Sequence, residues 1–365
     1  MRNPGVTNDH LRILHLIPTL VGGGAERQIT YLARGLAGMG IDVHVGILRE
    51  GCNLERLLES EATVHHIASR SNYDVLIVPR IVRLIRRIRP HLVQTWLTHM
   101  DVAGGAAALM TATPWLLSER AAPLAYPRDA KNRLRGFIGR FASAVVANSP
   151  SGLDVWKHNR SPRFVVPNAI PFDEIASTPA DDDIVPRDER IVLFAGRLAP
   201  QKNLPTLIAA LAEVTSRPDV VAILCGAGEL EAGVRAMIAA TGRGDRIRLI
   251  GFNHRLWNLM KRADAVVLVS WFEGHPNVVL EAIAAGCPVV VSDITEHRAF
   301  LGEEEALFVP PHDSAAIANA ILRTLDDRDA ARARAANARR AVQRWSIDHV
   351  AAEYARIYDQ LRVKT

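Results

Sequence analysis

Along most of the chain, short apolar runs alternate with stretches whose apolar residues recur every three or four positions. Residues 11–17 form a mostly apolar run that stops at Pro18 and is followed by a run of glycines, which predicts a buried strand. Residues 26–38 have apolar positions at helical spacing and end beside two glycines, which predicts a helix. Alternating units of this kind indicate parallel sheets with helices on both faces.

The alternation runs nearly to the end of the sequence. It predicts further strands at residues 43–48, 92–96, 115–117, 144–147, 164–167, 191–195, 220–225, 247–250, 265–269 and 288–292. It predicts further helices at residues 77–88, 204–215, 278–285 and 345–361.

One interval interrupts the pattern. Residues 171–189 contain three prolines and a run of aspartates at 181–183, and they have no apolar period, which is typical of a linker. The sequence therefore predicts an N-terminal Rossmann-like domain over 1–170, a linker over 171–189 and a second Rossmann-like domain over 190–340. The predicted fold is α/β, with two doubly wound domains that face a central cleft.

Length and composition fit this organisation. The chain has 365 residues, of which 48% are hydrophobic and 23% charged, as in a folded protein of two domains. No apolar run reaches the ~20 residues of a membrane span, and residues 1–10 lack the layout of a secretory signal. The three cysteines are scattered, so neither a disulfide framework nor a zinc cluster is expected. We expect a cytoplasmic protein.

The formal charge of +5 is unevenly spread, because the first 170 residues are basic and the remainder is mildly acidic. Few aromatics and the lack of nucleic-acid-binding motifs argue against nucleic-acid binding. Two basic segments, 78–89 and 128–141, interleave arginines with apolar residues. They fit docking on an anionic membrane surface, and they equally fit amphipathic helices that pack on a sheet and leave their basic faces in water.

The first candidate motif is Gly22-Gly23-Gly24, which lies between a predicted strand and a predicted helix. Glycines allow a ligand to approach the backbone closely, and the following helix presents N–H groups to an anion. The spacing is neither the dinucleotide fingerprint nor a P-loop. The same glycines also fit a tight turn without a ligand.

The second motif is Gly196-Arg197…Lys202-Asn203, directly after a strand. Doubly wound folds bind ligands at the carboxyl ends of their strands, and two fixed cations there suit a diphosphate. The alternative is a pair of solvated surface charges ahead of a helix.

The third motif is the stretch from Trp271 to Val289, which contains Glu273, Asn277 and Glu281. A helix that begins at residue 277 or 278 places Asn277 and Glu281 on one face, and Glu273 lies in the loop before it. Apolar neighbours surround Glu281, so a carboxylate without a partner there would be costly. Two acids beside a diphosphate site suit the recognition of sugar hydroxyls.

With these motifs in order, the chain resembles the family-four glycosyltransferases, which are retaining enzymes with the GT-B fold. The Gly196–Asn203 block and the Glu273-x7-Glu281 block carry the resemblance. Looser matches lie at residues 22–27, 118–120, 148–149, 166–168 and 225–229. In this family the C-terminal helix crosses back to the first domain, which matches residues 341–365.

The resemblance implies a role for each matched residue. Arg197 and Lys202 would hold the donor diphosphate and stabilise the leaving group, Glu281 would bind the ribose, and Glu273 would bind the donor sugar. Gly22 to Gly24 would approach the diphosphate from the other domain, and His99 would position the reacting sugar. The remaining donor-binding residues would be Gly226, Phe252, Asn277, Val278 and Val279, with backbone amides at 277–279.

The expected partners are a nucleotide-diphosphate sugar, with UDP favoured, and a glycan or lipid-linked glycan acceptor. A GDP-mannose-dependent mannosyltransferase is the first alternative, and a non-catalytic nucleotide- or sugar-binding protein is the second. No Asp-x-Asp pair lies in a plausible donor loop, so no metal and no other cofactor is expected. His275 and Ala169 depart from the family pattern, which leaves sugar selectivity and the turn at 168–169 open.

Overall fold

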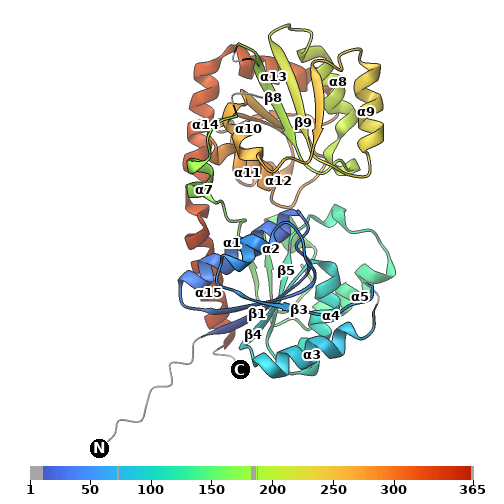
Figure 1. The fold of residues 1–365 in the computed structure, drawn as a ribbon, viewed down its shortest axis with the longest axis vertical. Coiled ribbons are helices and arrows are strands. Elements are labelled where there is room, and N and C mark those ends of the chain that lie inside the picture. The colour runs from blue at the N-terminus through green and yellow to red at the C-terminus, as the bar shows by residue number, and fades with distance from the viewer. Residues whose placement is uncertain (1–10, 72–73, 182–185, 187, 363–365) are drawn as a thin grey trace, which may run out of the picture. The chain divides into compact units, whose positions relative to one another are not determined.

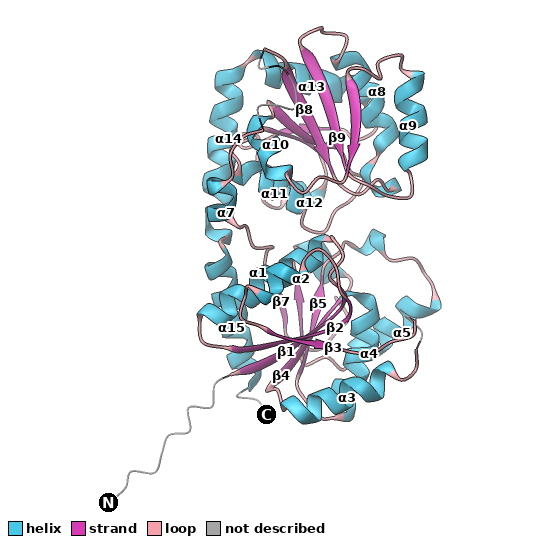
Figure 2. Ribbon diagram, viewed as in Figure 1, coloured by secondary structure: helices cyan, strands magenta, loops and turns pink. Residues whose placement is uncertain are grey.

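The computed structural model describes residues 11–71, 74–181, 186 and 188–362. The chain divides into two compact units, which we call unit 1 (Met1–Ala169 with Trp345–Thr365) and unit 2 (Ile170–Arg344). Each unit is a parallel sheet with helices on both faces (Figures 1 and 2). The prediction of two Rossmann-like α/β domains is confirmed.

In unit 1 the strand order is β3-β2-β1-β4-β5-β6-β7, and all neighbouring pairs are parallel. The strands are β1 (Arg12–Thr19), β2 (Asp42–Arg49), β3 (Thr63–His66), β4 (Leu92–Trp96), β5 (Trp115–Glu119), β6 (Ala144–Ala147) and β7 (Arg163–Val165). The helices are α1 (Gly24–Gly38), α2 (Leu54–Leu58), α3 (Ile77–Ile88), α4 (Leu97–Met110), η1 (Pro123–Ala125), α5 (Ala130–Gly139), α6 (Pro150–Asp154) and α15 (Ile347–Arg362).

In unit 2 the strand order is β10-β9-β8-β11-β12-β13, again all parallel. The strands are β8 (Arg190–Ala195), β9 (Val220–Cys225), β10 (Ile247–Gly251), β11 (Ala265–Leu268), β12 (Val289–Ser292) and β13 (Leu307–Val309). The helices are α7 (Phe172–Ser177), η2 (Pro200–Lys202), α8 (Leu204–Val214), α9 (Glu231–Ala240), α10 (Leu256–Arg262), α11 (Asn277–Ala284), α12 (Thr295–Arg298), α13 (Ser314–Asp326) and α14 (Arg328–Val342); η3 (Gln343–Trp345) lies at the boundary.

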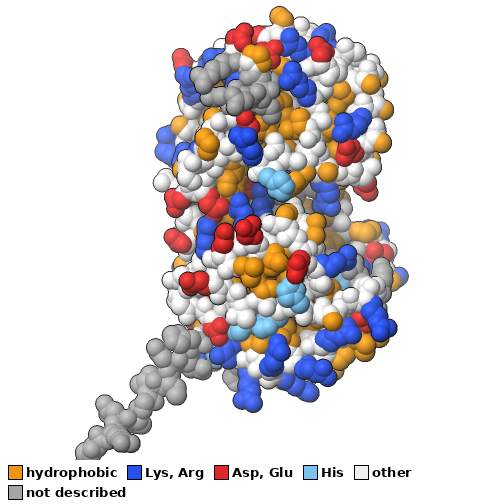
Figure 3. Space-filling view, viewed as in Figure 1, with side chains coloured by type: hydrophobic (Ala, Val, Ile, Leu, Met, Phe, Trp, Pro, Cys, Tyr) orange, Lys and Arg blue, Asp and Glu red, His pale blue; other side chains and the backbone are white. Residues whose placement is uncertain are grey.

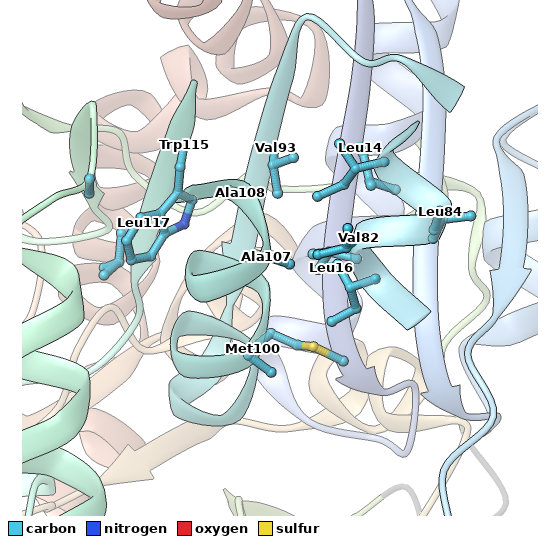
Figure 4. Close-up of a cluster of buried hydrophobic side chains, with 14 of the residues drawn as sticks. Leu14, Leu16, Val82, Leu84, Val93, Met100, Ala107, Ala108, Trp115 and Leu117 are labelled. Carbon is cyan, nitrogen blue, oxygen red and sulfur yellow. The ribbon is translucent and has the colours of Figure 1, made fainter. Parts of the chain in front are cut away.

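The core of unit 1 explains the apolar pattern of its strands. Strands β4, β5 and β6 are buried along their whole length, as expected for a parallel sheet covered on both faces. Figure 4 shows part of the cluster that covers one face, to which the sheet contributes Leu14 and Val93, α4 contributes Met100 and α3 contributes Leu84. The helical spacing of α3 therefore reflects packing on this sheet.

The interval 171–189 contains more order than its composition predicts. Helix α7 occupies residues 172–177 and packs on α11 within unit 2. Part of the interval, including two of its three consecutive aspartates, lies outside the described residues. The polar start, residues 1–10, also lies outside them. At the other end of the chain, α15 packs on α1 in unit 1 (Figure 1).

Candidate functional site

The loop that follows β8 is held against the loop that follows β9 by a close backbone approach. The Gly196 amide donates to the Cys225 carbonyl over 3.0 Å. A Cβ atom at Gly226 would overlap the Gly196 carbonyl oxygen, so only glycine fits there. The amide of Gly226 in turn donates to the Gly251 carbonyl at the end of β10, over 2.8 Å. Three strand ends are thus joined into one surface.

Two cations extend from this surface, and they differ in their surroundings. The Arg197 side chain is exposed and has no hydrogen bond or ion pair among the described residues. The Lys202 ammonium is largely covered and lies 2.6 Å from Oε1 of Glu273. Asn203, in the left-handed conformation at φ 53°, directly precedes α8 and donates to the Val269 carbonyl over 3.2 Å, which fixes the end of the loop.

Glu273 is only 6% exposed, although it lies in the loop after β11. Its second oxygen, Oε2, accepts from Nε2 of Gln201 over 3.2 Å. The same Gln201 group donates to the Phe272 carbonyl over 2.7 Å, and the Trp271 amide donates to the Gln201 carbonyl over 2.9 Å. These bonds join the loops after β8 and β11 and hold both oxygens of Glu273. Sequence reasoning missed Gln201, although it lies next to Lys202.

Helix α11 carries the second expected carboxylate. Glu281 is 3% exposed, and its Oε2 accepts from the indole Nε1 of Trp257 in α10 over 3.0 Å. Asn277 is the first residue of the helix, as expected. The Val279 amide donates to the Pro276 carbonyl over 3.1 Å, so this amide is already bonded within the first turn of the helix. Val278 is half-buried.

Trp257 and His297 are two further residues that the sequence patterns did not single out. His297 in α12 is fully buried, and its Nδ1 lies 2.8 Å from the Ser292 carbonyl. Burial lowers the pKa of His297, and the charges of Glu273 and Lys202 act on it in opposite directions. A neutral imidazole therefore lies close to the Lys202–Glu273 pair. The only sequence signal was the position of His297 just after β12.

Phe252 is exposed in the loop that follows β10. Its ring meets the ring of His254 edge to face, with centroids 4.9 Å apart. An exposed aromatic face at a strand end suits stacking against a planar group.

The glycine turn and His99 belong to unit 1. Gly22 has φ 60°, as a left-handed turn requires, and α1 begins at Gly24. The Glu26 carboxylate folds back over Gly23 and would have to move to admit a side chain there. A carboxylate at this position is favourable for the amino end of α1, so the turn already has an anion of its own in this structure.

His99 lies in the first turn of α4, half-buried at the carboxyl end of β4. Burial lowers its pKa, and the charges of Lys131 and Arg49 add to that effect. Leu97, two residues earlier, has φ 67°, a strained conformation for a branched side chain. Such strain is frequent where a junction presents a functional residue.

The two basic segments of unit 1 differ in structure. In α3 the apolar stripe is buried, and Arg83, Arg86 and Arg87 form its solvated face. Figure 3 shows Lys and Arg side chains gathered around this part of unit 1. In and around α5, by contrast, large apolar side chains are exposed: Leu134 (48%), Phe137 (58%) and Phe141 (56%).

Arg135, which the sequence placed among the surface cations of the second basic segment, is an exception. It is 3% exposed, with Nε 2.7 Å from Oδ2 of Asp101 and Nη2 2.8 Å from Oε2 of Glu119. Of the cations in residues 128–141, Arg135 is therefore not available to a docking surface. Its guanidinium forms ion pairs with two buried carboxylates. The sequence pattern around α5 did not predict this pairing.

Within the described residues, no group of three or more His, Cys, Asp or Glu side chains could hold a metal ion. Over the same residues, no helix combines the length and apolar character needed to cross a bilayer. The three cysteines are free thiols.

Unit 2 thus brings most of the expected site residues to one edge of its sheet. Arg197, Lys202, Gly226, Phe252 and Glu273 follow β8 to β11, and Asn277, Val278, Val279 and Glu281 lie on α11. Gly22, Gly23, Gly24 and His99 lie at strand ends of unit 1. Cations beside carboxylates at the carboxyl ends of parallel strands suit a ligand that carries both phosphate and hydroxyl groups.

Comparisons with known proteins identify the family and the fold. Residues 22–174 match the family described as Glycosyltransferase Family 4, and residues 180–341 match Glycosyl transferases group 1. The structure of Anabaena HepE, solved in complex with UDP and glucose, superposes with a TM-score of 0.85 at 22% identity and covers 96% of this chain and 100% of that one. The fold and the sequence together define a GT-B glycosyltransferase.

Two relatives show how far the sequence similarity extends. An uncharacterized glycosyltransferase of Methanocaldococcus jannaschii is 32% identical over 175 residues, 47% of this chain and 45% of that protein. The lipopolysaccharide core biosynthesis glycosyltransferase LpsE of Rhizobium meliloti is 27% identical over 313 residues, 84% of this chain and 86% of that protein. The match thus spans about half of the first relative and most of the second. The chain belongs to the group 1 glycosyltransferases of the family-four type.

Proposed function

We propose that this protein transfers a hexose or N-acetylhexosamine from a nucleotide-diphosphate sugar to a glycan or lipid-linked glycan, with retention of configuration at the anomeric carbon. The observation that carries the proposal is the edge of unit 2, where Arg197, Lys202, Glu273 and Glu281 gather at the ends of β8 and β11 and on α11. UDP is the proposed nucleotide, and the UDP and glucose found in HepE support it. GDP-mannose is the second candidate.

In this proposal each residue acts on a separate part of the donor. Negative charge develops on the diphosphate as the glycosidic bond breaks, and the Arg197 and Lys202 cations stabilise it there. Glu273 accepts a hydrogen bond from a hydroxyl of the transferred sugar, and Glu281 accepts from the ribose. The chemistry needs no metal in this scheme, because the two cations take the role of charge neutralisation.

His99 and Gly22 to Gly24 are proposed to complete the reaction from unit 1. Burial holds the pKa of His99 down, which favours a neutral imidazole at physiological pH that can accept a hydrogen bond from a sugar hydroxyl. The strained Leu97 fixes the start of the helix that carries it.

Nucleotide binding tests the donor site. We expect calorimetry to show that one of UDP, GDP and ADP binds selectively and that Lys202→Ala and Glu281→Ala both weaken it. Arg235→Ala, which removes an exposed arginine of the same unit, is the control and should bind normally. Binding of none of the three, or binding that ignores both substitutions, would contradict the proposal. The anomeric configuration of the product, determined by NMR, tests retention.

The proposed acceptor is a glycan or lipid-linked glycan, presented at the inner face of a membrane. LpsE, named for lipopolysaccharide core biosynthesis, supports an acceptor in glycan assembly. The α5 surface, which we define as Leu134, Phe137 and Phe141 with Lys131 and Arg133, supports docking because exposed aromatics and cations together suit an anionic bilayer.

Vesicle sedimentation tests this surface against simple charge attraction. Vesicles of phosphatidylcholine and phosphatidylglycerol should sediment wild type, and Phe137→Ser with Phe141→Ser should reduce the bound fraction several-fold. Leu109→Ser with Met110→Ser is the matched control, since both side chains are exposed elsewhere in unit 1. Equal loss with the control pair, or no sedimentation of wild type at low salt, would overturn membrane docking. The proposed cytoplasmic location agrees with the three free thiols.

A further inference from the structure

Three polar side chains that have no role in the donor site meet at one edge of unit 1. Arg120 follows β5, Asn148 follows β6, and Asn168 lies shortly after β7. Nη1 of Arg120 donates to Oδ1 of Asn168 over 3.3 Å, and Nδ2 of Asn148 reaches the same oxygen at 3.4 Å. The carboxyl edge of a doubly wound sheet is where such folds bind their ligands.

Arg120 has no acidic partner in this cluster. Among the described residues it forms no ion pair, and its Nε, which is shielded from solvent, has no hydrogen-bond partner. Its guanidinium lies over the ring of Trp96, 4.2 Å from the ring centroid. The ring supports a cation from one side, but it provides no counter-charge.

The contrast with Arg135 in the same unit shows how unusual this is. Arg135 is held by the two buried carboxylates of Asp101 and Glu119. Glu119 directly precedes Arg120 in the chain, yet its carboxylate is bonded to Arg135, Tyr126 and Trp156. Two buried carboxylates of unit 1 therefore neutralise Arg135, whereas Arg120 has no carboxylate partner among the described residues.

Asn148 adds an acceptor to the same edge. The residue is 3% exposed, and its Oδ1 has no hydrogen-bond partner among the described residues. A buried amide oxygen without a partner is costly unless a ligand supplies a donor.

Two titratable groups beside Arg120, His15 and Tyr354, add no charge to the cluster. His15, whose Nδ1 accepts from the Trp96 indole over 3.2 Å, is fully buried. Burial and the charge of Arg120 lower the pKa of His15 to about 3, so its imidazole is neutral at physiological pH. Tyr354 of α15 is also buried nearby, and burial raises its pKa, so it is neutral as well.

We propose that Arg120 and Asn148 form an anion-binding subsite of unit 1 that takes a phosphate or diphosphate group carried by the acceptor. A guanidinium fork binds phosphate oxygens in pairs, and the Asn148 oxygen accepts from a neighbouring hydroxyl of the same ligand. The assignment to the acceptor rests on the proposed function, whereas the anion site itself does not.

The experiment measures binding of inorganic pyrophosphate and of farnesyl diphosphate by calorimetry, with the donor site disabled by Arg197→Ala and Lys202→Ala. Both probes should still bind this variant, and adding Arg120→Gln should weaken each at least tenfold. Arg83→Gln, an exposed arginine of α3, is the control and should change nothing. Because the donor-site variant could fold poorly, the same titrations are repeated on wild type saturated with UDP.

Each outcome decides a part of the proposal. Loss of both probes on Arg120→Gln supports the acceptor subsite, whereas binding of pyrophosphate with exclusion of farnesyl diphosphate overturns its assignment to the acceptor. No binding of either, or binding indifferent to Arg120→Gln, overturns the subsite itself. UDP titrated into Arg120→Gln should bind as in wild type, so failure of the donor proposal is seen separately.

Thermal unfolding separates a binding role from a structural one. If Arg120 awaits a ligand, Arg120→Gln should leave the unfolding temperature of the ligand-free protein unchanged or raise it, and it should abolish the upward shift caused by pyrophosphate. Arg120→Lys should keep part of that shift, because it retains the charge and loses the fork. A large drop in unfolding temperature without ligand would show that the arginine is structural.

Discussion

Lys202 and Glu273 form an ion pair, with Nζ 2.6 Å from Oε1, although 71 positions separate them in the sequence. The resemblance assigned one to the donor diphosphate and the other to the donor sugar. The structure shows them as partners, with the second carboxylate oxygen held by Gln201. A diphosphate that binds here approaches a lysine whose charge is already partly balanced, while Arg197 has no such partner among the described residues.

This pairing makes Lys202→Ala a substitution with two consequences. It removes one charge-assisted bond to the diphosphate, and it leaves the Glu273 carboxylate uncompensated beside the ligand's own negative charge. We expect the affinity for the preferred nucleotide diphosphate to fall 10- to 100-fold, since a hydrogen bond to a charged group contributes about 1.5–3 kcal/mol.

Glu273→Gln in the same background reveals the coupling. The double variant Lys202→Ala with Glu273→Gln should bind UDP more tightly than Lys202→Ala alone, because the repulsion is gone. Calorimetric titration of UDP into wild type, the two single variants and the double variant measures this coupling. Strictly additive losses would mean that the pair is broken before the ligand arrives.

Trp257 is expected to position Glu281 through its indole N–H. Trp257→Phe keeps most of the aromatic ring and removes only the indole N–H. The Glu281 carboxylate then loses the hydrogen bond that orients it. We expect about tenfold weaker binding of UDP and unchanged binding of 2′,3′-dideoxy-UDP, which lacks the ribose hydroxyls. Trp271→Phe is the control, because its indole has no partner among the described residues. Equal losses for both nucleotides would assign Trp257 to another part of the ligand.

The sequence patterns located most of the strands, because apolar runs are local signals, and missed only the short strands β3 and β13 among the described residues. The predicted strand at 191–195 is β8, and the predicted helix at 278–285 is α11 to within one residue. What they could not give was the pairing between loops that end different strands. Trp257 and Gln201 act through side chains that meet only after the sheet has formed, so no spacing in the sequence marks them.

Arg135 shows the same limit in unit 1. It lies among other cations in residues 128–141, so the sequence pattern grouped it with charges of one basic face. Its partners Asp101 and Glu119 come from α4 and the end of β5, and only the packing of α5 onto these elements buries the arginine. A pattern of alternating charge and apolar residues cannot distinguish an arginine that faces water from one that faces two buried acids.

Substitution of Arg135 by leucine should therefore destabilise unit 1 strongly. Two buried carboxylates would lose their cation, and breaking such a network costs about 3–5 kcal/mol. Urea unfolding of the full chain measures the loss. Arg133→Leu, an exposed neighbour on the same helix, should shift the unfolding free energy by no more than about 0.5 kcal/mol. A loss below about 1 kcal/mol for Arg135→Leu would mean that water reaches the carboxylates.

His15 should make the stability of unit 1 depend on pH. Its pKa is about 3 in the folded protein against 6.5 ordinarily, so between these values the unfolded chain binds the extra proton. Above about pH 6.5 this histidine does not reduce the free energy of unfolding. As the pH falls below that value, the free energy of unfolding decreases by up to about 1.4 kcal/mol per pH unit.

His15→Gln isolates this effect. Glutamine retains an oxygen that can accept from Trp96 and does not titrate. Between pH 7 and pH 5, the unfolding free energy of wild type should fall by up to about 2 kcal/mol more than that of the variant. Parallel profiles for the two proteins would show that the imidazole reaches solvent.

Helix α15 belongs to unit 1 but follows unit 2 in the chain, which links the order of synthesis to the folding of unit 1. Tyr354 and Tyr358 of α15 are buried in unit 1, where the Tyr358 hydroxyl donates to Gln94 at the centre of the sheet. Unit 2 is made of one continuous stretch, whereas unit 1 needs residues translated about 175 positions after its first segment ends. A ribosome therefore synthesises the whole of unit 2 before it adds the tyrosines that complete the core of unit 1, so the unit that begins the chain is the second to have all of its residues.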